Sequence, residues 1–219
     1  MKTLIVQKDV ADIDLARHLD EAGKKGADLV CFGELATTGC LYSRREVPSL
    51  EEVLRSFEPY DLRIMAGVPL VQDGHLRNSY LYYYRGDYKT YHKINLFPPF
   101  GEPGVFWPGR DPGLWETDFG RVGVAICYDL RFPDLFARLK ALSVGIIFVP
   151  AAFPRVRITE WRTLLVQRAM ETGARVVGIN SVGYDGRNEF GGSSMVIDPT
   201  GRIIAQADAA SSTVLEAEL

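Results

Sequence analysis

A buried strand turns into a helix within residues 121–139 (RVGVAICYDLRFPDLFARL), and this corner constrains the fold more than any other stretch. Over residues 121–126, β-branched residues alternate with glycine and alanine, which is typical of a strand buried by its neighbours. Pro133 fits the first position of a helix, and leucine and phenylalanine follow it at helical spacing. Cys127 is therefore predicted to lie at the carboxyl end of a strand, just before the amino end of a helix.

The position of Cys127 permits two interpretations. The amino end of a helix carries unpaired N–H groups and partial positive charge, which can lower the pKa of a thiol to roughly 3.5–7.5 from about 8.5. Alternatively, the cysteine is a small apolar residue of the core, as lone cysteines after buried strands usually are. The corner alone favours the core interpretation, so the case for a nucleophile depends on the rest of the chain.

The amino-terminal part of the chain predicts a strand–helix–strand unit. Residues 2–7 and 29–32 are short apolar runs, and residues 12–25 carry apolar side chains at helical spacing. Such a unit places its two strands parallel and side by side. Glu34 closes the second strand, at the same kind of strand end that carries Cys127. Its carboxylate either caps nearby backbone N–H groups or takes part in catalysis, and both roles stay open at this point.

The middle of the chain predicts antiparallel strands over residues 63–71, 76–84 and 88–91, joined by tight turns at 73–74 and 86–87. We interpret the tyrosines of these strands as sheet packing, because the basic groove of a nucleic-acid stacking platform is missing. The other expected elements are helices over 50–57 and 159–172, and strands over 114–117, 121–126, 144–149, 175–180, 196–197, 203–206 and 213–219. Without repeats or breaks in composition, we expect one α/β domain over residues 1–219, with two sheet layers covered by helices.

Charge and cysteine content narrow the class of protein. The 25 Lys and Arg residues against 28 Asp and Glu give a formal net charge of -3, so electrostatics favours neither nucleic acid nor an anionic membrane. The longest apolar stretch, 144–153, is too short to span a bilayer, and residues 1–14 do not resemble a signal peptide. Three cysteines without CxxC spacing argue against a disulfide framework or a metal site, and we expect a cytoplasmic protein.

The least regular segment, residues 91–109 (YHKINLFPPFGEPGVFWPG), is rich in proline, glycine and aromatic residues, yet it contains Lys93 and Glu102. Irregular loops on a rigid sheet often carry functional residues. No histidine follows His92, which excludes the order of papain-like sites, in which the cysteine comes first. A histidine that precedes the cysteine, His75 or His92, remains possible as its partner.

A carboxylate can also manage the proton of a thiol, if burial or a nearby like charge raises its pKa. Lys93 can then stabilise an oxyanion as a fixed cation, and the backbone N–H of Tyr128, directly after Cys127, is placed to act as a second donor. Cysteine, glutamate and lysine together suit acyl transfer from an amide. In that reaction the thiol attacks, the amine leaves and water hydrolyses the thioester.

These motifs resemble one known family. The segments FGEL at Glu34, YHKINLFPPFGEPGVFWPG at Lys93 and CYDLRFPDLF at Cys127 are similar to those of the nitrilase-like carbon–nitrogen hydrolase superfamily. The downstream segments WRTLLVQRAMETGARVVGINSVG and GGSSMVIDPTGRI also resemble it, so the likeness covers nearly the whole chain in the right order.

The resemblance implies a four-layer αββα sandwich, an α/β fold of two mixed sheets flanked by helices. It implies Glu34 as general base, Lys93 as oxyanion stabiliser and Cys127 as nucleophile. It also implies Glu102 as a second active-site carboxylate, which positions Lys93 or assists proton transfer. We expect a small-molecule amide as substrate, no cofactor, and a homodimer.

The CYDLRFP corner looks most like that of omega-amidases and related small-amide hydrolases, which favours amides over nitriles. By this likeness Arg131 pairs with a substrate carboxylate. The alternative is an exposed arginine at the helix entry, bonded to Asp129.

The sequence departs from the family pattern in several places. By comparison with the family that it resembles, Gly33 stands in place of the usual proline and Asp134 in place of the usual glutamate. The same comparison leads us to expect a shortened chain between residues 36 and 63 and at the carboxyl end. The alternatives are nitrile or carbamoyl hydrolysis on the same site, or a catalytically weak binding or scaffold protein. A redox-sensing thiol is a further alternative, which needs Cys31 or Cys40 to approach Cys127 in space.

Overall fold

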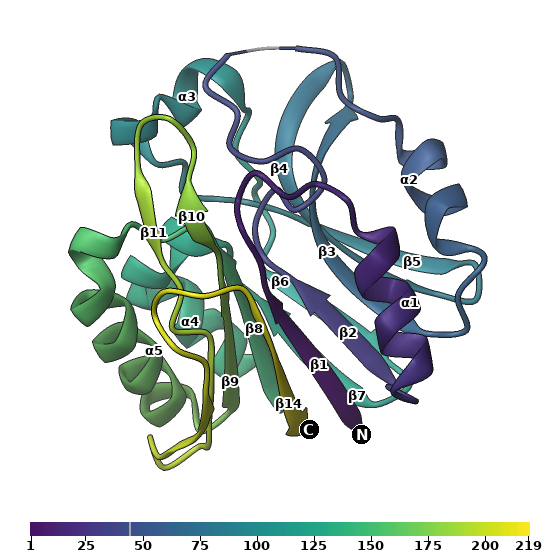
Figure 1. Cartoon of the computed structure of the whole chain (residues 1–219). Coiled ribbons are helices and arrows are strands. Elements are labelled where there is room, and N and C mark those ends of the chain that lie inside the picture. The colour runs from purple at the N-terminus through teal and green to yellow at the C-terminus, as the bar shows by residue number, and fades with distance from the viewer. Residues whose placement is uncertain (44) are drawn as a thin grey trace.

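Two six-stranded sheets pack face to face in the computed structural model, which describes residues 1–43 and 45–219 (Figure 1). The first sheet has the order β14 (Thr213–Glu218), β1 (Lys2–Gln7), β2 (Leu29–Phe32), β3 (Arg63–Gln72), β4 (His75–Tyr84), β5 (Asp87–His92). The second has the order β13 (Ile203–Gln206), β12 (Met195–Ile197), β9 (Arg175–Asn180), β8 (Ile146–Ala151), β7 (Gly120–Val124), β6 (Gly113–Thr117). Both sheets mix parallel and antiparallel neighbours, so the predicted fold class is confirmed.

Helices cover the outer faces of both sheets. The first sheet carries α1 (Ala16–Lys24) and α2 (Leu50–Phe57), and the second carries α4 (Pro133–Ala141) and α5 (Ile158–Thr172) (Figure 1). The short helix α3 (Glu102–Val105) lies at one end of the sandwich, near the small hairpin of β10 (Val182–Tyr184) and β11 (Glu189–Gly191). The layers therefore follow the order helix, sheet, sheet, helix.

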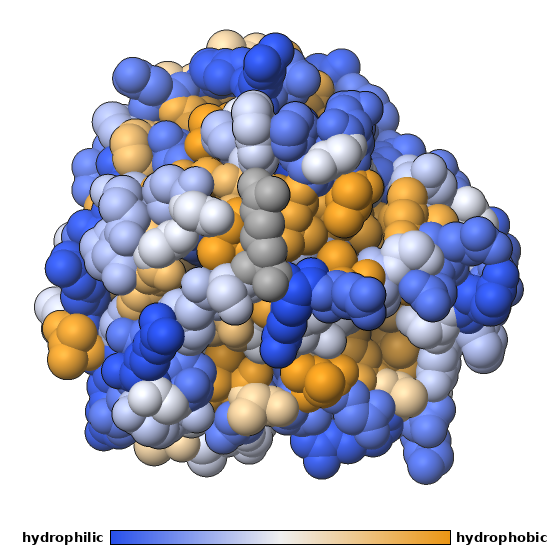
Figure 2. Space-filling view, turned by 90° about the horizontal axis from the view of Figure 1, so that it is seen from above, coloured by the Kyte–Doolittle hydropathy of each residue, from blue (hydrophilic) through white to orange (hydrophobic). Residues whose placement is uncertain are grey.

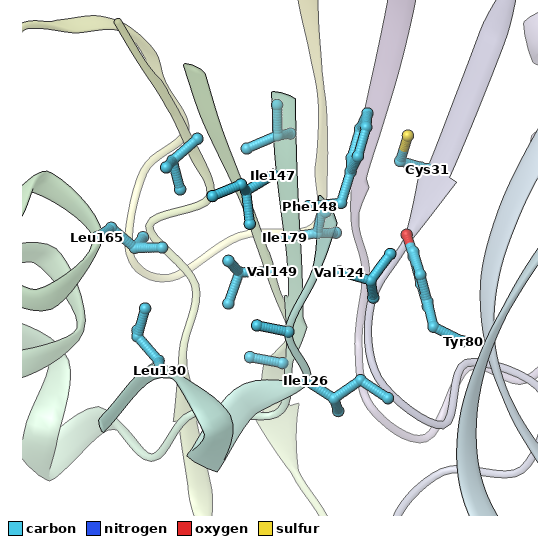
Figure 3. Close-up of a cluster of buried hydrophobic side chains, with 14 of the residues drawn as sticks. Cys31, Tyr80, Val124, Ile126, Leu130, Ile147, Phe148, Val149, Leu165 and Ile179 are labelled. Carbon is cyan, nitrogen blue, oxygen red and sulfur yellow. The ribbon is translucent and has the colours of Figure 1, made fainter. Parts of the chain in front are cut away.

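The alternation of side chains along β2 shows how the layers are held together. Leu29 and Cys31 point into the cluster between the sheets, whereas Val30 and Phe32 pack under α1 and α2. This is the period of two that a strand buried on both faces requires. Figure 3 shows the inner cluster, in which Cys31 and Tyr80 of the first sheet approach Val124 and Phe148 of the second. Burial of both faces explains why the apolar runs predicted strands so well.

The space-filling view from above shows the end of the sandwich at which the strand-end loops gather (Figure 2). Apolar side chains are visible there in hollows between polar ones, so the polar surface does not cover this end completely.

Element boundaries differ from the predictions where side chains bond to the backbone. The first helix begins at Ala16, not Asp12, because the Asp14 carboxylate accepts a hydrogen bond from the Ala16 N–H at 3.0 Å and holds a turn before the helix. The expected helix over residues 50–57 is present, with a capping box between Ser49 and Glu52. The hairpin of β10 and β11 was not predicted.

Candidate active site

Glu34 lies just beyond β2, on a backbone held close to β3. Leu35 has a φ of 51°, and the Gly67 N–H donates to the Gly33 carbonyl at 3.1 Å. A Cβ atom on Gly67 would stand 2.4 Å from the Gly33 oxygen and 2.7 Å from the carbonyl carbon of Glu34. Only glycine permits this approach, so the position of Glu34 depends on the absence of a side chain at residue 67.

Lys93, directly after β5, is fully buried and lies between two carboxylates. Its ammonium nitrogen is 2.8 Å from Oε1 of Glu34 and 2.8 Å from Oε1 of Glu102. Burial lowers the pKa of Lys93, but the negative charges of Glu102 and Glu34 outweigh it and hold the pKa well above its usual value. Lys93 therefore carries a fixed positive charge inside the protein.

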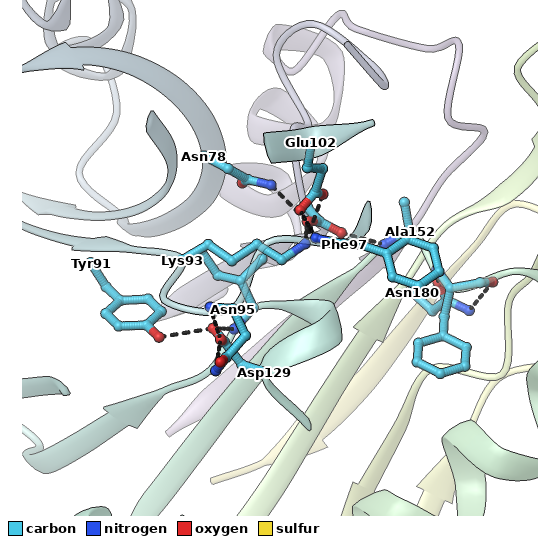
Figure 4. A network of polar contacts seen from close by, with 12 residues as sticks. Asn78, Tyr91, Lys93, Asn95, Phe97, Glu102, Asp129, Ala152 and Asn180 are labelled. Atoms are coloured by element: carbon cyan, nitrogen blue, oxygen red, sulfur yellow. Dashed lines mark hydrogen bonds and ion pairs between the residues drawn. The ribbon is translucent and has the colours of Figure 1, made fainter. Parts of the chain in front are cut away.

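Further donors fix the orientation of both carboxylates (Figure 4). Oε1 of Glu34 also accepts from the Asn78 side chain at 2.8 Å, and its Oε2 accepts from the Ala152 N–H at 3.0 Å. Oε2 of Glu102 accepts from the Phe97 N–H at 2.7 Å, which ties the start of α3 to the irregular loop. Burial raises the pKa of Glu102, and the nearby Lys93 ammonium opposes the shift.

Cys127 begins a 3₁₀ turn, Cys127–Arg131, between β7 and α4. Its φ of 47° is unusual for a residue other than glycine, and such backbone strain is common at functional sites. Burial raises the pKa of the thiol well above its usual value, and the charge of Glu34 raises it further, although Lys93 opposes both. The expectation that the helix end lowers this pKa is therefore wrong, because burial and the carboxylates dominate.

Cys127 lines two small cavities. The inner one, about 20 Å³, is bounded by Glu34, Cys40, Tyr42, Phe97, Glu102 and Ala152, among others. The outer one, about 10 Å³, is bounded by Phe97, Tyr128, Arg131, Ala152, Phe153, Pro154 and Arg157. Each volume is about that of one water molecule. A larger hollow of about 410 Å³ runs along β5 and residues 109–112, but neither Cys127 nor any of the charged groups described above lines it.

The family model described as carbon-nitrogen hydrolase matches residues 13–219. The chain belongs to the carbon–nitrogen hydrolase family. Its relatives include the 2-oxoglutaramate amidase of Bacillus subtilis, 30% identical over 215 residues that cover 91% of this chain and 81% of the relative. Another is the omega-amidase YafV of Yersinia enterocolitica, 31% identical over 100% of this chain and 90% of the relative.

Among solved structures, a mutant of the amidase from Nesterenkonia sp. AN1 shows the result of Michael addition of acrylamide at the active site cysteine. It superimposes with a TM-score of 0.88 at 20% identity, covering 100% of this chain and 93% of that chain. The shared fold agrees with the two-sheet sandwich described above. As a carbon–nitrogen hydrolase whose named relatives are amidases, the protein is an enzyme that acts on carbon–nitrogen bonds other than peptide bonds.

Arg131 of this carbon–nitrogen hydrolase is held by a partner that the sequence did not predict. Its guanidinium forms a two-pronged ion pair with Glu160 of α5, with one contact of 2.8 Å, and does not bond to Asp129. The alternative of an Asp129-bonded arginine is therefore wrong. The guanidinium carbon also lies 5.6 Å from the ring centroid of Tyr128, so both residues form one wall of the outer cavity.

The structure brings Glu34, Lys93, Glu102 and Cys127 together from three segments, as one buried cluster. Sequence reasoning missed Asn78, although an asparagine inside a strand whose neighbours are buried is itself a signal. Asn78 is 1% exposed and is committed to Glu34. The expected histidine candidates take no part, because His75 stacks on Trp107 and His92 bonds to Ser79.

Within residues 1–43 and 45–219, no three His, Cys, Asp or Glu side chains are grouped so that they could hold a metal ion. None of the helices in the same ranges has the length and apolar character needed to cross a membrane.

Proposed function

We propose that this carbon–nitrogen hydrolase converts the carboxamide of a small molecule into a carboxylate and ammonia through a thioester on Cys127. The observation that carries the proposal is the Lys93 ammonium, fully buried between Glu34 and Glu102 beside the Cys127 thiol. The thiol is protonated in this surrounding and needs a base, and the Glu34 carboxylate lies close enough to bond to it and to raise its pKa.

In the proposed reaction, Glu34 takes the thiol proton while the Cys127 sulfur attacks the amide carbon. The carbonyl oxygen becomes an oxyanion, stabilised by the Lys93 ammonium and by the backbone N–H of Tyr128, which lies in the first turn of the 3₁₀ helix and needs no intrahelical partner. Glu34 returns the proton to the nitrogen, the C–N bond breaks and ammonia leaves.

Hydrolysis of the thioester uses the same groups. A water molecule takes the place of ammonia beside Glu34, in the inner cavity of about 20 Å³. Glu34 accepts a proton from this water as its oxygen attacks the thioester carbon. When the C–S bond breaks, Glu34 returns this proton to the Cys127 sulfur, and the released carboxylic acid loses its own proton to solvent to give the carboxylate. Glu102 holds the Lys93 ammonium throughout, because its other oxygen is anchored to the Phe97 N–H.

The substrate that we propose carries a carboxylate besides its amide. Arg131 and Arg157 border the outer cavity next to Cys127, and both contact Glu160; Arg157, half-exposed and 3.7 Å from Glu160, is the less tightly held of the two. The relatives named 2-oxoglutaramate amidase and omega-amidase point to the same class of amide. Replacement of Arg157 by Met should raise KM for carboxylate-bearing amides and leave KM for simple aliphatic amides close to that of the native enzyme.

The test is release of ammonia from a panel of carboxylate-bearing amides, 2-oxoglutaramate included, aliphatic amides, ureido compounds and nitriles. Glu34→Gln should lower kcat by roughly 10²- to 10⁴-fold, the usual contribution of a general base. Mass spectrometry of a rapidly quenched reaction should show an acyl group on Cys127. If ammonia is released at the native rate by Cys127→Ala, the proposal is wrong, and preference for ureido compounds or nitriles would select those alternatives.

The remaining expectations stay proposals: one domain over residues 1–219, a homodimer, and a cytoplasmic location. Exposed apolar side chains of the second sheet and its helix support the dimer: Met170 of α5 is 61% exposed and lies close to Gly201, and Ile203 and Ile204 of β13 are also exposed. Light scattering after size-exclusion chromatography gives the mass in solution, and a monomer with full activity would contradict the dimer.

A further inference from the structure

The Asp129 carboxylate is the most heavily bonded acidic group near the site. It is fully buried and accepts four hydrogen bonds. Oδ1 accepts from the backbone N–H of Asn95 at 2.8 Å and from the Asn95 side chain at 2.9 Å. Oδ2 accepts from the Tyr91 hydroxyl at 2.8 Å and from the Ile126 N–H at 2.9 Å. Every contact is a donor, which is the surrounding of an ionised carboxylate and not of an amide.

These donors flank the two groups that the proposed chemistry must bring together. Tyr91 and Asn95 stand two residues before and two residues after Lys93, and Figure 4 shows their side chains turned toward Asp129. Ile126 directly precedes Cys127. The Asp129 N–H also donates to the Ile126 carbonyl at 3.0 Å, so the turn around Cys127 is closed on both sides. One carboxylate thus binds the Lys93 segment to the Cys127 turn.

We propose that Asp129 is the positioning residue that fixes the Lys93 ammonium relative to the Cys127 thiol, and thereby the place of the oxyanion. This inference rests on the proposed function. Asp129 does not line either cavity beside Cys127, so it acts through the two segments that it joins. The unusual backbone of Cys127, with its φ of 47°, is one conformation that these bonds maintain.

The change Asp129→Asn tests the charge and keeps the shape. Two of the four donors can adapt to the new side chain: the Asn95 side-chain amide can rotate to present its oxygen, and the Tyr91 hydroxyl can accept a hydrogen bond instead of donating one. The two backbone N–H groups, of Asn95 and Ile126, lie on opposite oxygens and can only donate. Whichever way the new amide is turned, one of them faces an NH₂ group and loses its acceptor. One of the two segments is therefore released.

We expect Asp129→Asn to lower kcat by about 100-fold, the effect of a misplacement of roughly 1 Å in a reacting group. KM should stay close to the native value, because the lost interaction belongs to the transition state. The pH profile of kcat should keep its shape, since Asp129 transfers no proton. Tyr91→Phe removes one donor and leaves the other three, so it should lower kcat only slightly.

A matched control separates positioning from a general loss of stability. Gln7 is also fully buried, and its side chain also joins separate segments through hydrogen bonds. It donates to the Asp208 and Ser211 carbonyls and accepts from the Ser194 N–H at 2.9 Å. Gln7→Glu is the reverse isosteric exchange and lines neither cavity beside Cys127. Gln7→Glu should lower the melting temperature. Its kcat should equal that of the native enzyme when it is divided by the amount of Cys127 that iodoacetamide alkylates.

Native kcat per alkylatable Cys127 in Asp129→Asn would overturn the inference, as would an equal loss in Gln7→Glu. If the native enzyme releases no ammonia from any amide, the proposed function fails, and the crystal structure of Asp129→Asn then decides the inference independently. A shift of Lys93 relative to Cys127 supports positioning by Asp129. An unchanged separation of the two side chains overturns it.

Discussion

Cys31 and Cys127 belong to the same hydrophobic cluster, one within β2 and one just beyond β7, yet their surroundings differ. Within residues 1–43 and 45–219, burial is the one influence on the Cys31 thiol, whose sulfur lies 3.9 Å from that of Met65. Burial alone raises the pKa of this thiol. Around Cys127, burial is joined by the charges of Glu34, Lys93 and Glu102.

The comparison shows that burial does not make a thiol reactive. Burial between the sheets keeps the Cys31 thiol protonated, and no carboxylate of the described residues lies beside it to accept the proton. Beyond the ends of the strands, the ammonium of Lys93 and the carboxylates of Glu34 and Glu102 lie beside Cys127. Under the proposed function, the difference between the inert thiol and the nucleophile therefore lies in a few charged neighbours.

The largest expected difference is in amide turnover, between alanine variants of Cys127 and of Cys31. Cys127→Ala should lower amide turnover on the order of 10⁶-fold, as removal of a nucleophile does elsewhere, with little change in stability. Cys31→Ala should keep native kcat and cost about 1 kcal/mol of folding free energy, because it leaves a small void between the sheets. Ammonia release and urea unfolding measure the two effects. A large loss of kcat in Cys31→Ala would break the comparison.

The second contrast concerns the buried cation, Lys93. Lys93→Met leaves Glu34 and Glu102 buried together without an ammonium, which should cost about 3–5 kcal/mol of unfolding free energy. Protonation of one carboxyl relieves the repulsion, so the loss should be larger at pH 8 than at pH 5. Lys140→Met is the control, because Lys140 is exposed and donates only to the Glu171 carbonyl. Equal urea stability of the two variants would contradict the role given to Lys93.

The third contrast concerns His92, the chain neighbour of Lys93. Burial, assisted by the positive charge of Arg77, lowers the pKa of His92 to about 4 from 6.5, although Asp73 opposes the shift. The unfolded chain binds a proton at higher pH than the folded chain does. The contribution of His92 to stability is therefore complete above about pH 6.5 and is lost as the pH falls through 4.

His92→Gln can keep the hydrogen bond to Ser79 and cannot titrate. Its melting temperature should fall less steeply than that of the native protein between pH 6.5 and 4. Parallel pH curves for the two proteins would mean that His92 does not stay neutral in the folded state. In that case His92 and Lys93, which are neighbours in the chain, would no longer differ as a neutral and a charged side chain in the folded protein.

Much of the fold was predictable because local patterns and tertiary packing agree. β2 is buried on both faces, so its apolar run predicts a strand whatever lies around it. α4 begins at Pro133, as its sequence predicts. The strand ends at Glu34 and Cys127 were also visible, since polar or reactive residues there interrupt apolar runs.

The rest depends on contacts between distant segments. Glu160, the partner of Arg131, is 29 residues away along the chain, on a helix whose orientation no local pattern gives. Asp129 was considered only as a partner for Arg131, whereas its four donors come from other segments. The direction of the Cys127 pKa likewise follows from three-dimensional burial, which the helix-end argument does not contain.

The size of the inner cavity has a consequence for the fate of an acyl-enzyme. Water competes with any other nucleophile for the thioester, and the ratio of products reports which acceptors reach it. Once the acyl group is bound, the space open to an acceptor beside the buried Glu34 is the one that the departing ammonia leaves, and it suits water or hydroxylamine better than an amino acid. Acyl transfer to hydroxylamine should therefore partition against hydrolysis, whereas transfer to bulky amines should not be detectable. The cavity then acts as a sieve for the acceptor and makes the enzyme a hydrolase instead of a general transferase.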